Sequence, residues 1–322
     1  MTTYDIERDF DRLYDVFRRM TERRAPAIPV LTGPTATGKS SMATRLAEER
    51  GLELVSCDAM QVYRHFDIGT AKPPRAVQAR VRHHFIDSVE PTESISVAAY
   101  VEAATARIRQ LLDAGRPMIV CGGSVQYVSA LLDGLTFIDV PVDRALRQTI
   151  AREIERRGVE ASWEMIRAMD PEAAEKIAPT DRRRIGRFFE LYRQTGMTKT
   201  EHNRRSREHG PRFDFQAYWL DWMPRSQLYE AINDRVDRMF ERGLVDEVRR
   251  LMDMYPDIEH TPAFRGIGYG DTVLYLQGRL SLEDARDNIK RSTRRYAKRQ
   301  QTWLRRRDDL HRLILDRSDR SS

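Results

Sequence analysis

The chain has 322 residues, which is long enough for two domains or for one core with a large insert. Hydrophobic residues make up 40% of it, enough for a buried core, and the net charge of +6 favours a polyanionic partner without establishing one. Its charged N-terminus and lack of a long apolar run argue against secretion and membrane insertion, so we expect a cytoplasmic protein.

The N-terminal segment carries apolar residues at helical spacing. This spacing predicts a helix over residues 5–24, which we expect to lie outside the core fold. The apolar positions are Phe10, Leu13, Val16, Phe17 and Met20.

Three short apolar segments follow, separated by helical sequence. AIPVLT (27–32), LELVSCD (52–58) and RPMIVCGGS (116–124) each predict a buried strand. One helix is expected to begin at about Lys39, and another to cover residues 97–114. This alternation of strand and helix favours an α/β fold with a parallel sheet.

The sequence changes character after about residue 140. From Asp143 to about Gly196 it is rich in arginine and glutamate and predicts a helical insert, before FDFQAYWLDW (213–222) resumes the strand pattern. Further helices are expected over 225–242, 244–254 and 282–307. We therefore divide the chain into an N-terminal helical extension (1–25), the first part of the core (26–140), the helical insert (141–200), and a core continuation with basic C-terminal helices (201–322).

The segment GPTATGKS matches the phosphate-loop pattern G-x-x-x-x-G-K-[ST] in full. A predicted strand precedes it and a predicted helix follows it, so we expect a P-loop NTPase-like core. In such a loop the backbone N–H groups bind phosphate oxygens, Lys39 adds positive charge, and the Ser40 hydroxyl can bind Mg²⁺. The expected anion contacts are Gly33, Pro34, Thr35, Ala36, Thr37, Gly38, Lys39 and Ser40.

Polar residues follow the second and third predicted strands, at the edge where open α/β sheets bind ligands. Asp58 has two interpretations, either the cap of a helix or turn, or a general base or outer metal partner facing the phosphate loop. Gln61 and Tyr63 could bind a nucleobase edge. Ser124, in the turn after the third strand, should reach the same edge. Lys72 and Pro73 suggest a structural turn with a positive contact, but most lysines in such loops are simply solvated, which is the expectation for Lys72.

The cysteines and histidines do not predict a metal cluster. Cys57 and Cys121 lie in apolar runs without metal-ligand spacing and are expected to be reduced, buried thiols. The adjacent pair His83 and His84 would point to opposite faces of a strand. Any metal ion is therefore expected to be held mainly by phosphate.

Two arginine clusters, over residues 182–187 and 291–299, contribute much of the positive charge. Each could be an ordinary solvated helix face. Aromatic neighbours such as Phe188 and Tyr296 make a nucleic-acid-binding surface the alternative interpretation.

Several segments between about Pro29 and Arg306 form an ordered set: GPTATGKS, DAMQVYR, DIGTAKP, GGSVQY, DRRRIGRFFELYRQTG, GLVDEV, GIGY and RRYAKRQQTWLR. In this combination the chain resembles the tRNA dimethylallyltransferases, which attach a dimethylallyl (isopentenyl) group to N6 of the adenosine next to the anticodon.

The resemblance implies that the phosphate loop holds the diphosphate of dimethylallyl diphosphate, together with Mg²⁺, and not ATP for hydrolysis. It implies that Asp58 is the general base and that Lys39, Ser124 and Arg235 contact the diphosphate. Independently of the resemblance, the helical spacing of Arg235 with Leu228 and Ile232 predicts that its side chain points inward. It further implies that the helical insert binds the anticodon stem-loop of tRNA and that the protein is a monomer. The implied tRNA contacts are Asp58, Ala59, Met60, Gln61, Arg183, Arg184, Arg187, Arg265, Gly266, Ile267, Gly268 and Tyr269.

The chain departs from the usual family pattern at several positions, which bear on base contacts, donor preference and rate more than on the reaction class. These positions are Ala59, Ser124, Val125, Gln126, Thr180, Arg265 and Gly270.

Three other functions compete with this one. A P-loop kinase or NTPase would release phosphate from ATP. An enzyme that prenylates free AMP or ADP would not need the basic insert. A non-catalytic RNA-binding protein would not need the Lys39 and Asp58 pair.

Overall fold

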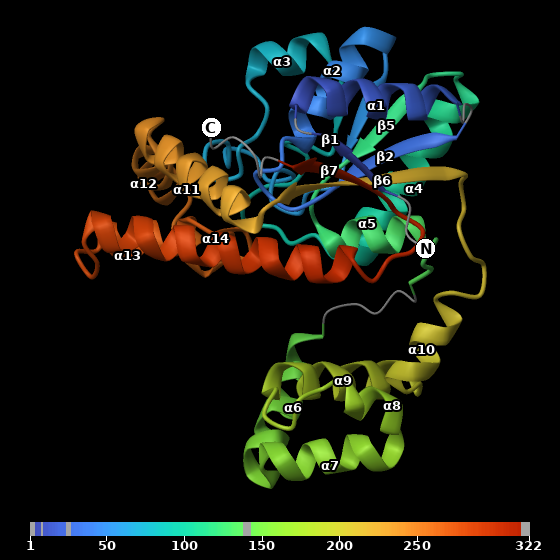
Figure 1. Ribbon diagram of the computed structural model, residues 1–322. Coiled ribbons are helices and arrows are strands. Elements are labelled where there is room, and N and C mark those ends of the chain that lie inside the picture. The colour runs from blue at the N-terminus through green and yellow to red at the C-terminus, as the bar shows by residue number, and fades with distance from the viewer. Residues whose placement is uncertain (1–3, 8, 24–26, 138–142, 317–322) are drawn as a thin grey trace. The chain divides into compact units, whose positions relative to one another are not determined.

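The computed structural model describes residues 4–7, 9–23, 27–137 and 143–316 (Figure 1). The chain divides into two compact units. The core unit comprises residues 1–132 and 213–322, and the helical unit comprises residues 133–212.

A parallel sheet forms the centre of the core unit. In the part of the chain that the structure describes, it has seven strands in the order β1-β7-β6-β2-β5-β3-β4, and all neighbouring strands run parallel. This confirms the predicted α/β class. The strands are β1 (Tyr4–Glu7), β2 (Ile28–Thr32), β3 (Glu53–Ser56), β4 (His83–His84), β5 (Met118–Cys121), β6 (Phe215–Met223) and β7 (His311–Asp316).

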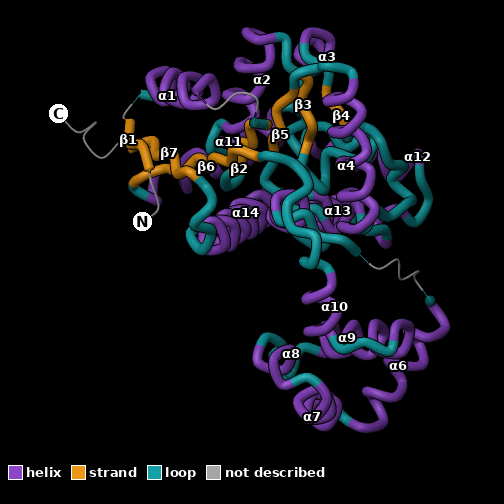
Figure 2. Tube along the Cα trace, turned by 90° about the vertical axis from the view of Figure 1, so that its right-hand side faces the viewer, coloured by secondary structure: helices purple, strands orange, loops and turns teal. Residues whose placement is uncertain are grey.

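Helices cover both faces of this sheet, with α1 and α2 on one side and α14 on the other (Figures 1 and 2). Connections of this kind are what a parallel sheet requires, because each strand must be reached by a crossover. The helices of the core unit are α1 (Phe10–Arg23), α2 (Lys39–Arg50), α3 (Arg75–Arg80), α4 (Val97–Asp113), α5 (Val125–Leu132), α11 (Arg225–Glu241), α12 (Leu244–Met254), α13 (Tyr269–Leu276) and α14 (Leu282–Leu304), with short 3₁₀ helices at Ile258–His260 and Ala263–Arg265.

The central strands are largely buried because both of their faces are covered. Every residue of β3 and β5 is buried, and β2 pairs with β5 on one side and β6 on the other. The carboxyl ends of β2, β3 and β5 therefore meet at one edge of the sheet, and this edge positions the site described below.

The N-terminal segment differs from its prediction. We expected one helix outside the core, but residues 4–7 form the edge strand β1, which pairs with β7, and α1 begins only at Phe10. Leu13, Tyr14 and Phe17 of α1 are at most 1% exposed and pack in one cluster with residues of β2, β6 and β7. Helix α1, which we expected to lie outside the core, thus packs on the sheet through its apolar residues.

The helical unit consists of short helices around its own apolar cluster. Ile150, Ile166, Ile185 and Phe188 are each at most 2% exposed and belong to this cluster. This agrees with the helical pattern of the sequence. The helices are α6 (Arg144–Arg157), α7 (Val159–Met169), α8 (Pro171–Glu175), α9 (Arg182–Thr195) and α10 (Lys199–Arg205).

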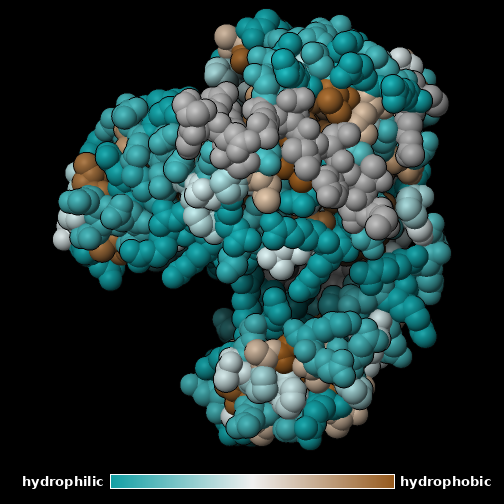
Figure 3. Space-filling model, in the orientation of Figure 1, coloured by the Kyte–Doolittle hydropathy of each residue, from teal (hydrophilic) through white to brown (hydrophobic). Residues whose placement is uncertain are grey.

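The face of the molecule drawn in Figure 3 is largely hydrophilic, with scattered apolar residues. Within the described residues, no helix combines the length and the apolar composition needed to cross a bilayer.

Candidate active site

A cavity of about 370 Å³ lies in the core unit, at the carboxyl edge of β2, β3 and β5. Loops that follow these strands line it together with side chains of α11 and α14. Most of the predicted site residues of the core unit meet here, and those that line the cavity are Thr35, Lys39, Ser40, Asp58, Ala59, Met60, Gln61, Ser124, Arg235, Arg265, Gly266, Ile267 and Tyr269.

The phosphate loop takes its shape from the backbone between β2 and α2. Gly38 has φ +89° directly before the first residue of α2, and a Cβ there would lie 2.7 Å from the Phe10 ring. Only glycine meets both demands without strain. The loop is braced further by a bond from the Trp222 indole N–H to the Thr37 carbonyl oxygen, at 3.2 Å.

Part of this loop faces the cavity and part forms its frame. Thr35, Lys39 and Ser40 line the cavity. Thr37 is buried, and its hydroxyl donates to Pro34 O at 2.9 Å. The predicted anion contacts that belong to the loop but not to the cavity lining are Gly33, Pro34, Ala36, Thr37 and Gly38.

Two cationic side chains converge on the cavity from different elements. Burial lowers the pKa of Lys39 below its ordinary value, and the neighbouring Arg235 lowers it further while Asp58 opposes the shift. Burial likewise lowers the pKa of Arg235, against the attraction of Asp58. Desolvated cations side by side favour the binding of an anion that neutralises both.

Arg235 points inward from α11, as its helical spacing predicts. It lines the cavity, and its Nη2 donates to Thr70 O at 3.5 Å. Arg238, one turn further on, is exposed. The core side of α11 is marked by Leu228, Ile232 and Val236, which are at most 1% exposed.

Asp58 is the cap of a turn, as one of its two sequence interpretations predicts, and its role as a general base stays a prediction. Its Oδ1 accepts hydrogen bonds from the backbone N–H groups of Met60 at 2.9 Å and Gln61 at 3.3 Å, which makes it the cap of a turn. The same carboxylate lines the cavity. Ala59 N–H donates to the Ser124 hydroxyl at 2.8 Å, so the turns after β3 and β5 are joined.

Close backbone approach holds the turn after β5 in place. A Cβ on Gly122 would overlap the Cys57 carbonyl group, so no larger residue fits between the two strand ends. Ser124 N–H donates to the same carbonyl oxygen at 3.2 Å. This packing brings the Ser124 hydroxyl to the cavity.

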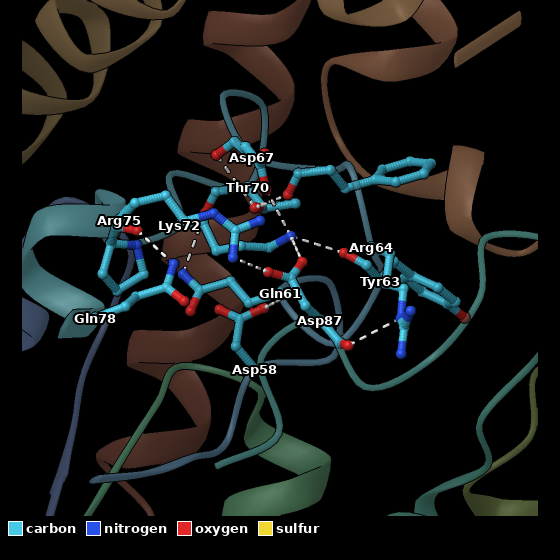
Figure 4. A network of polar contacts seen from close by, with 12 residues as sticks. Asp58, Gln61, Tyr63, Arg64, Asp67, Thr70, Lys72, Arg75, Gln78 and Asp87 are labelled. Carbon is cyan, nitrogen blue, oxygen red and sulfur yellow. Dashed lines mark hydrogen bonds and ion pairs between the residues drawn. The ribbon is translucent and has the colours of Figure 1, made fainter. Parts of the chain in front are cut away.

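The loop over residues 60–73 is built around a buried lysine (Figure 4). The Lys72 ammonium donates to Asp87 at 2.6 Å, to Asp67 at 2.7 Å and to Tyr63 O at 2.8 Å, and its side chain is 2% exposed. The expectation of a solvated Lys72 is therefore wrong, because two carboxylates and a carbonyl oxygen compensate its burial. Gln61 spans the same loop by donating to Thr70 O at 3.3 Å.

A second buried charged residue, from helix α12, binds the backbone of this loop. Glu247 of α12 is 3% exposed and accepts hydrogen bonds from three successive backbone N–H groups, those of residues 67–69, at 2.6–3.1 Å. The Tyr269 hydroxyl donates to the same carboxylate at 2.9 Å. Glu247 lies in the segment GLVDEV of the family pattern, but the sequence alone predicts no role for it.

The residues predicted to touch RNA around position 268 fall into two groups. Arg265 is exposed, and it lines the cavity with Gly266 and Ile267. Gly268 and Tyr269 are buried, and the Tyr269 ring packs against Phe66 at a centroid distance of 4.5 Å. Tyr269 nevertheless lines the cavity, and its contact with RNA stays a prediction.

Sequence reasoning missed the contribution of α14 to the cavity wall. Thr293, Tyr296, Arg299 and Gln300 all line it. Thr293 and Gln300 lie on the buried stripe of an otherwise basic helix, and polar residues at such positions are the signal that could have identified them. The cluster at 291–299 is thus not uniformly a solvated face.

The other arginine cluster belongs to α9 of the helical unit. Arg183, Arg184 and Arg187 are all exposed. Arg187 pairs with Glu190 at 2.8 Å, and Arg184 lies 3.5 Å from Asp181. These arginines are accessible to a polyanion, but they form no part of the cavity in the core unit.

The cysteines and the adjacent histidines take up structural positions in the core unit. Among the described residues, no group of three His, Cys, Asp or Glu side chains is arranged to hold a metal ion. Cys57 and Cys121 are free and buried, as expected. His84 pairs with Glu53 through Nε2 at 2.5 Å, and His83 Nδ1 donates to Val81 O at 2.7 Å.

Comparison with known proteins yields a single family. The family model described as IPP transferase matches residues 61–307. Proteins named tRNA dimethylallyltransferase are similar over nearly the whole chain. The one from Acetivibrio thermocellus is 39% identical, and the match covers 90% of this chain and 92% of that protein. One from Syntrophus aciditrophicus is 43% identical, and the match covers 87% of this chain and 89% of that protein.

Solved structures agree with these relatives. A tRNA isopentenylpyrophosphate transferase from Bacillus halodurans is 35% identical with a TM-score of 0.66, and the match covers 91% of each chain. A eukaryotic dimethylallyltransferase acting on tRNA is 27% identical with a TM-score of 0.74, over 92% of this chain and 75% of that one.

Proposed function

The chain belongs to the IPP transferase family, and we propose that it transfers a dimethylallyl group from dimethylallyl diphosphate to N6 of the adenosine next to the anticodon in tRNA. The reaction forms a bond between N6 and the allylic carbon and breaks the bond between that carbon and the diphosphate oxygen. One proton leaves the amine, and diphosphate is released.

The observation that carries this proposal is the convergence of two cations and one carboxylate on a single cavity. Lys39, Arg235 and Asp58 reach it from three different segments of the core unit. A phosphate loop next to two desolvated cations suits a diphosphate. Because negative charge grows on the diphosphate as the allylic C–O bond breaks, the same groups stabilise the transition state more than the ground state.

Asp58 is suited to accept the proton of the exocyclic amine. Its hydrogen bonds to Met60 N–H and Gln61 N–H both use Oδ1, and they fix the orientation of the carboxylate. Oδ2 is then the oxygen that takes the proton as the new N–C bond forms. We expect this base to face the amine while Lys39 and Arg235 hold the departing diphosphate.

The residues of the cavity also fit a magnesium ion. The Ser40 hydroxyl and the Asp58 carboxylate both line the cavity, and they are oxygen donors of the kind that Mg²⁺ prefers. Few protein ligands are typical of Mg²⁺ held mainly by phosphate. When bound, Mg²⁺ would neutralise part of the charge on the diphosphate.

The tRNA is proposed to bind through its anticodon stem-loop. Exposed Arg183, Arg184 and Arg187 offer contacts to the phosphate backbone, and Arg265 stands at the cavity itself. An adenine must leave the stack of the loop to reach a carboxylate inside a cavity, as other base-modifying enzymes require. We further propose that the protein acts in the cytoplasm as a monomer.

Mass spectrometry of tRNA nucleosides tests this function. Purified protein is incubated with unmodified tRNA, dimethylallyl diphosphate and Mg²⁺, and N6-dimethylallyl adenosine is expected in the digest. Asp58→Asn should lower turnover by about 10²-fold or more, since a lost general base has effects of that size. Release of phosphate from ATP without any modified nucleoside would instead favour a nucleotide hydrolase.

A further inference from the structure

Gln300 of α14 connects the two turns that face each other across the cavity edge. It is 2% exposed. Its Oε1 accepts the backbone N–H of Thr35 in the phosphate loop at 3.0 Å, and its Nε2 donates to Gly123 O, in the turn after β5, at 2.6 Å. One side-chain amide therefore binds both turns.

The partners determine how this amide is oriented. A backbone N–H can only donate and a carbonyl oxygen can only accept, so the oxygen of Gln300 must face Thr35 and its nitrogen must face Gly123. Apart from a protonated glutamate, no other neutral side chain of this length offers an acceptor and a donor at its end. Substitution by an apolar residue leaves a buried donor and a buried acceptor without partners.

The space around this contact is tight, so the two turns cannot shift independently. A Cβ on Gly123 would lie 2.9 Å from Gln300 Nε2, and 3.2 Å from both Gly33 O and Lys39 Cε. Ala36 of the phosphate loop packs against a cluster formed by Leu228 and Ile232 of α11 and Ala297 of α14. A shift of α14 would therefore move the turns that contain Lys39 and Ser124 together.

We propose that Gln300 is a positioning residue for diphosphate binding, which sets the separation between the phosphate loop and the Gly122–Ser124 turn. This inference rests on the proposed function, because the ligand it aligns is the diphosphate of the prenyl donor. Gln300 itself does not react. It holds the Thr35 amide and the Gly123 carbonyl where Lys39 and Ser124 can contact the same diphosphate.

Gln301 provides a matched control. It is the next residue of α14 and is 1% exposed, but it points elsewhere, since its Nε2 donates to the buried Asp221 at 2.6 Å. Loss of either glutamine removes a buried hydrogen bond and should reduce stability. Only loss of Gln300 changes the turns at the cavity.

The experiment compares full-length wild type, Gln300→Leu, Gln300→Glu and Gln301→Leu. Isothermal titration gives the Kd of inorganic pyrophosphate in the presence of Mg²⁺, steady-state assays give kcat and the KM of the donor, and filter binding gives the Kd of tRNA. Gln300→Leu should raise the pyrophosphate Kd and the donor KM by roughly ten-fold, as expected for two unpaired buried groups. The Kd of tRNA should not change, and Gln301→Leu should lower Tm without altering the pyrophosphate Kd.

Gln300→Glu separates the two hydrogen bonds. An ionised glutamate still accepts from Thr35 N–H but cannot donate to Gly123 O, and it adds negative charge beside the diphosphate. Its protonated form can do both, so the defect relative to wild type should shrink as the pH falls toward the glutamate pKa, ordinarily about 4.3. A role confined to stability would restore Tm as the pH falls while leaving the pyrophosphate Kd of the folded protein unchanged.

The outcomes distinguish this inference from the function on which it rests. A wild type that modifies no tRNA would overturn the proposed function. The positioning role would be overturned if the wild type is active but Gln300→Leu and Gln300→Glu bind pyrophosphate as tightly as the wild type does. Equal loss of pyrophosphate affinity in Gln300→Leu and Gln301→Leu would also overturn it, because the effect would then be one of general stability.

Discussion

Single residues at the cavity can hold a turn and also face the cavity. Asp58 caps a turn with one oxygen while its carboxylate faces the cavity. Such residues were predictable where a motif has a fixed spacing, as for Lys39 and Ser40, or where a carboxylate ends a strand, as for Asp58. Gln300 and Glu247 were not, because their partners lie about 180 to 265 residues away in the chain.

Departures from the family pattern can also be assessed residue by residue. Ala59 uses its backbone N–H, which any residue except proline would supply, to bind Ser124. Ser124 keeps the hydroxyl that a threonine would offer. Nothing in the structure explains Gly270, which is exposed in the first turn of α13.

Arg235 gives the sharpest test of the diphosphate position. Replacement by lysine keeps the positive charge but loses the planar pair of donors that an arginine presents to a diphosphate. We expect Arg235→Lys to lower kcat/KM for the donor by about ten-fold or more, with the tRNA Kd unchanged, in steady-state assays that vary one substrate at a time.

Arg238 is the control for this substitution. It lies on the same helix but is exposed, so Arg238→Lys should stay within about two-fold of wild type, as for most surface substitutions. A larger loss at Arg238 than at Arg235 would show that the diphosphate lies against another side of α11.

At the scale of elements, prediction worked for the central strands and the long helices and failed near one edge of the sheet. The segments of β2, β3 and β5 and the long amphipathic helices were all predicted. Strands β1 and β7 were missed. β1 has four residues of mixed polarity, and only its pairing with β7 makes it a strand. The role of α1 was mistaken because nothing in its local pattern indicates which surface it covers.

The loop over residues 60–73 depends on its buried lysine more than on its sequence propensity. Lys72→Met leaves the Asp87 and Asp67 carboxylates without their common partner. Because Asp67 is half exposed and water can solvate it, we expect a loss of about 3 kcal/mol, the lower end for a broken buried ion pair. Equilibrium urea unfolding, followed by circular dichroism, measures this change.

Lys176 offers the matched comparison. It pairs with Glu172 at 2.6 Å, but both side chains are more than half exposed, so Lys176→Met should cost at most about 1 kcal/mol. If the two lysine substitutions reduce the free energy of unfolding equally, the burial of Lys72 is not what holds the loop.

Helix α9 tests the RNA surface as one element. Reversing the charge of Arg183, Arg184 and Arg187 together should weaken tRNA binding and flatten its salt dependence. Each phosphate contact contributes about 0.7 to 0.9 to the slope of log K against log salt, the lower value applying to single strands. Filter binding over a series of salt concentrations checks this. A slope equal to that of wild type would mean that the cluster is an ordinary solvated face.

At the scale of the whole molecule, the division into two units places the cavity and the α9 arginines in separate parts of the chain. The core unit contains the phosphate loop, Asp58 and Arg235 in one cavity, while the helical unit has its own apolar cluster and exposed arginines. The change from alternating strands to continuous helices made this division readable from the sequence. How the ends of the insert meet could not be read from it, since that depends on contacts far apart in the chain.

Those ends lie next to each other in the structure. A Cβ on Gly134 would overlap the Gly210 carbonyl oxygen, and Thr136 N–H donates to Ser206 O at 2.8 Å. Deleting residues 135–209 and joining Gly134 directly to Gly210 should therefore close the core unit without strain. Both junction residues are glycines, which tolerate the new turn.

We expect this shortened protein to fold and to keep the cavity, because the sheet and every residue lining the cavity lie outside the deleted segment. It should bind inorganic pyrophosphate with nearly the wild-type Kd in isothermal titration, and its tRNA affinity should fall by at least about ten-fold as the phosphate contacts of the helical unit are lost. Circular dichroism and a cooperative thermal transition verify folding before either measurement. If the folded, shortened protein bound tRNA as tightly as wild type, the arginines of the helical unit would have no part in RNA recognition, and the basic surface of the core unit would have to supply it.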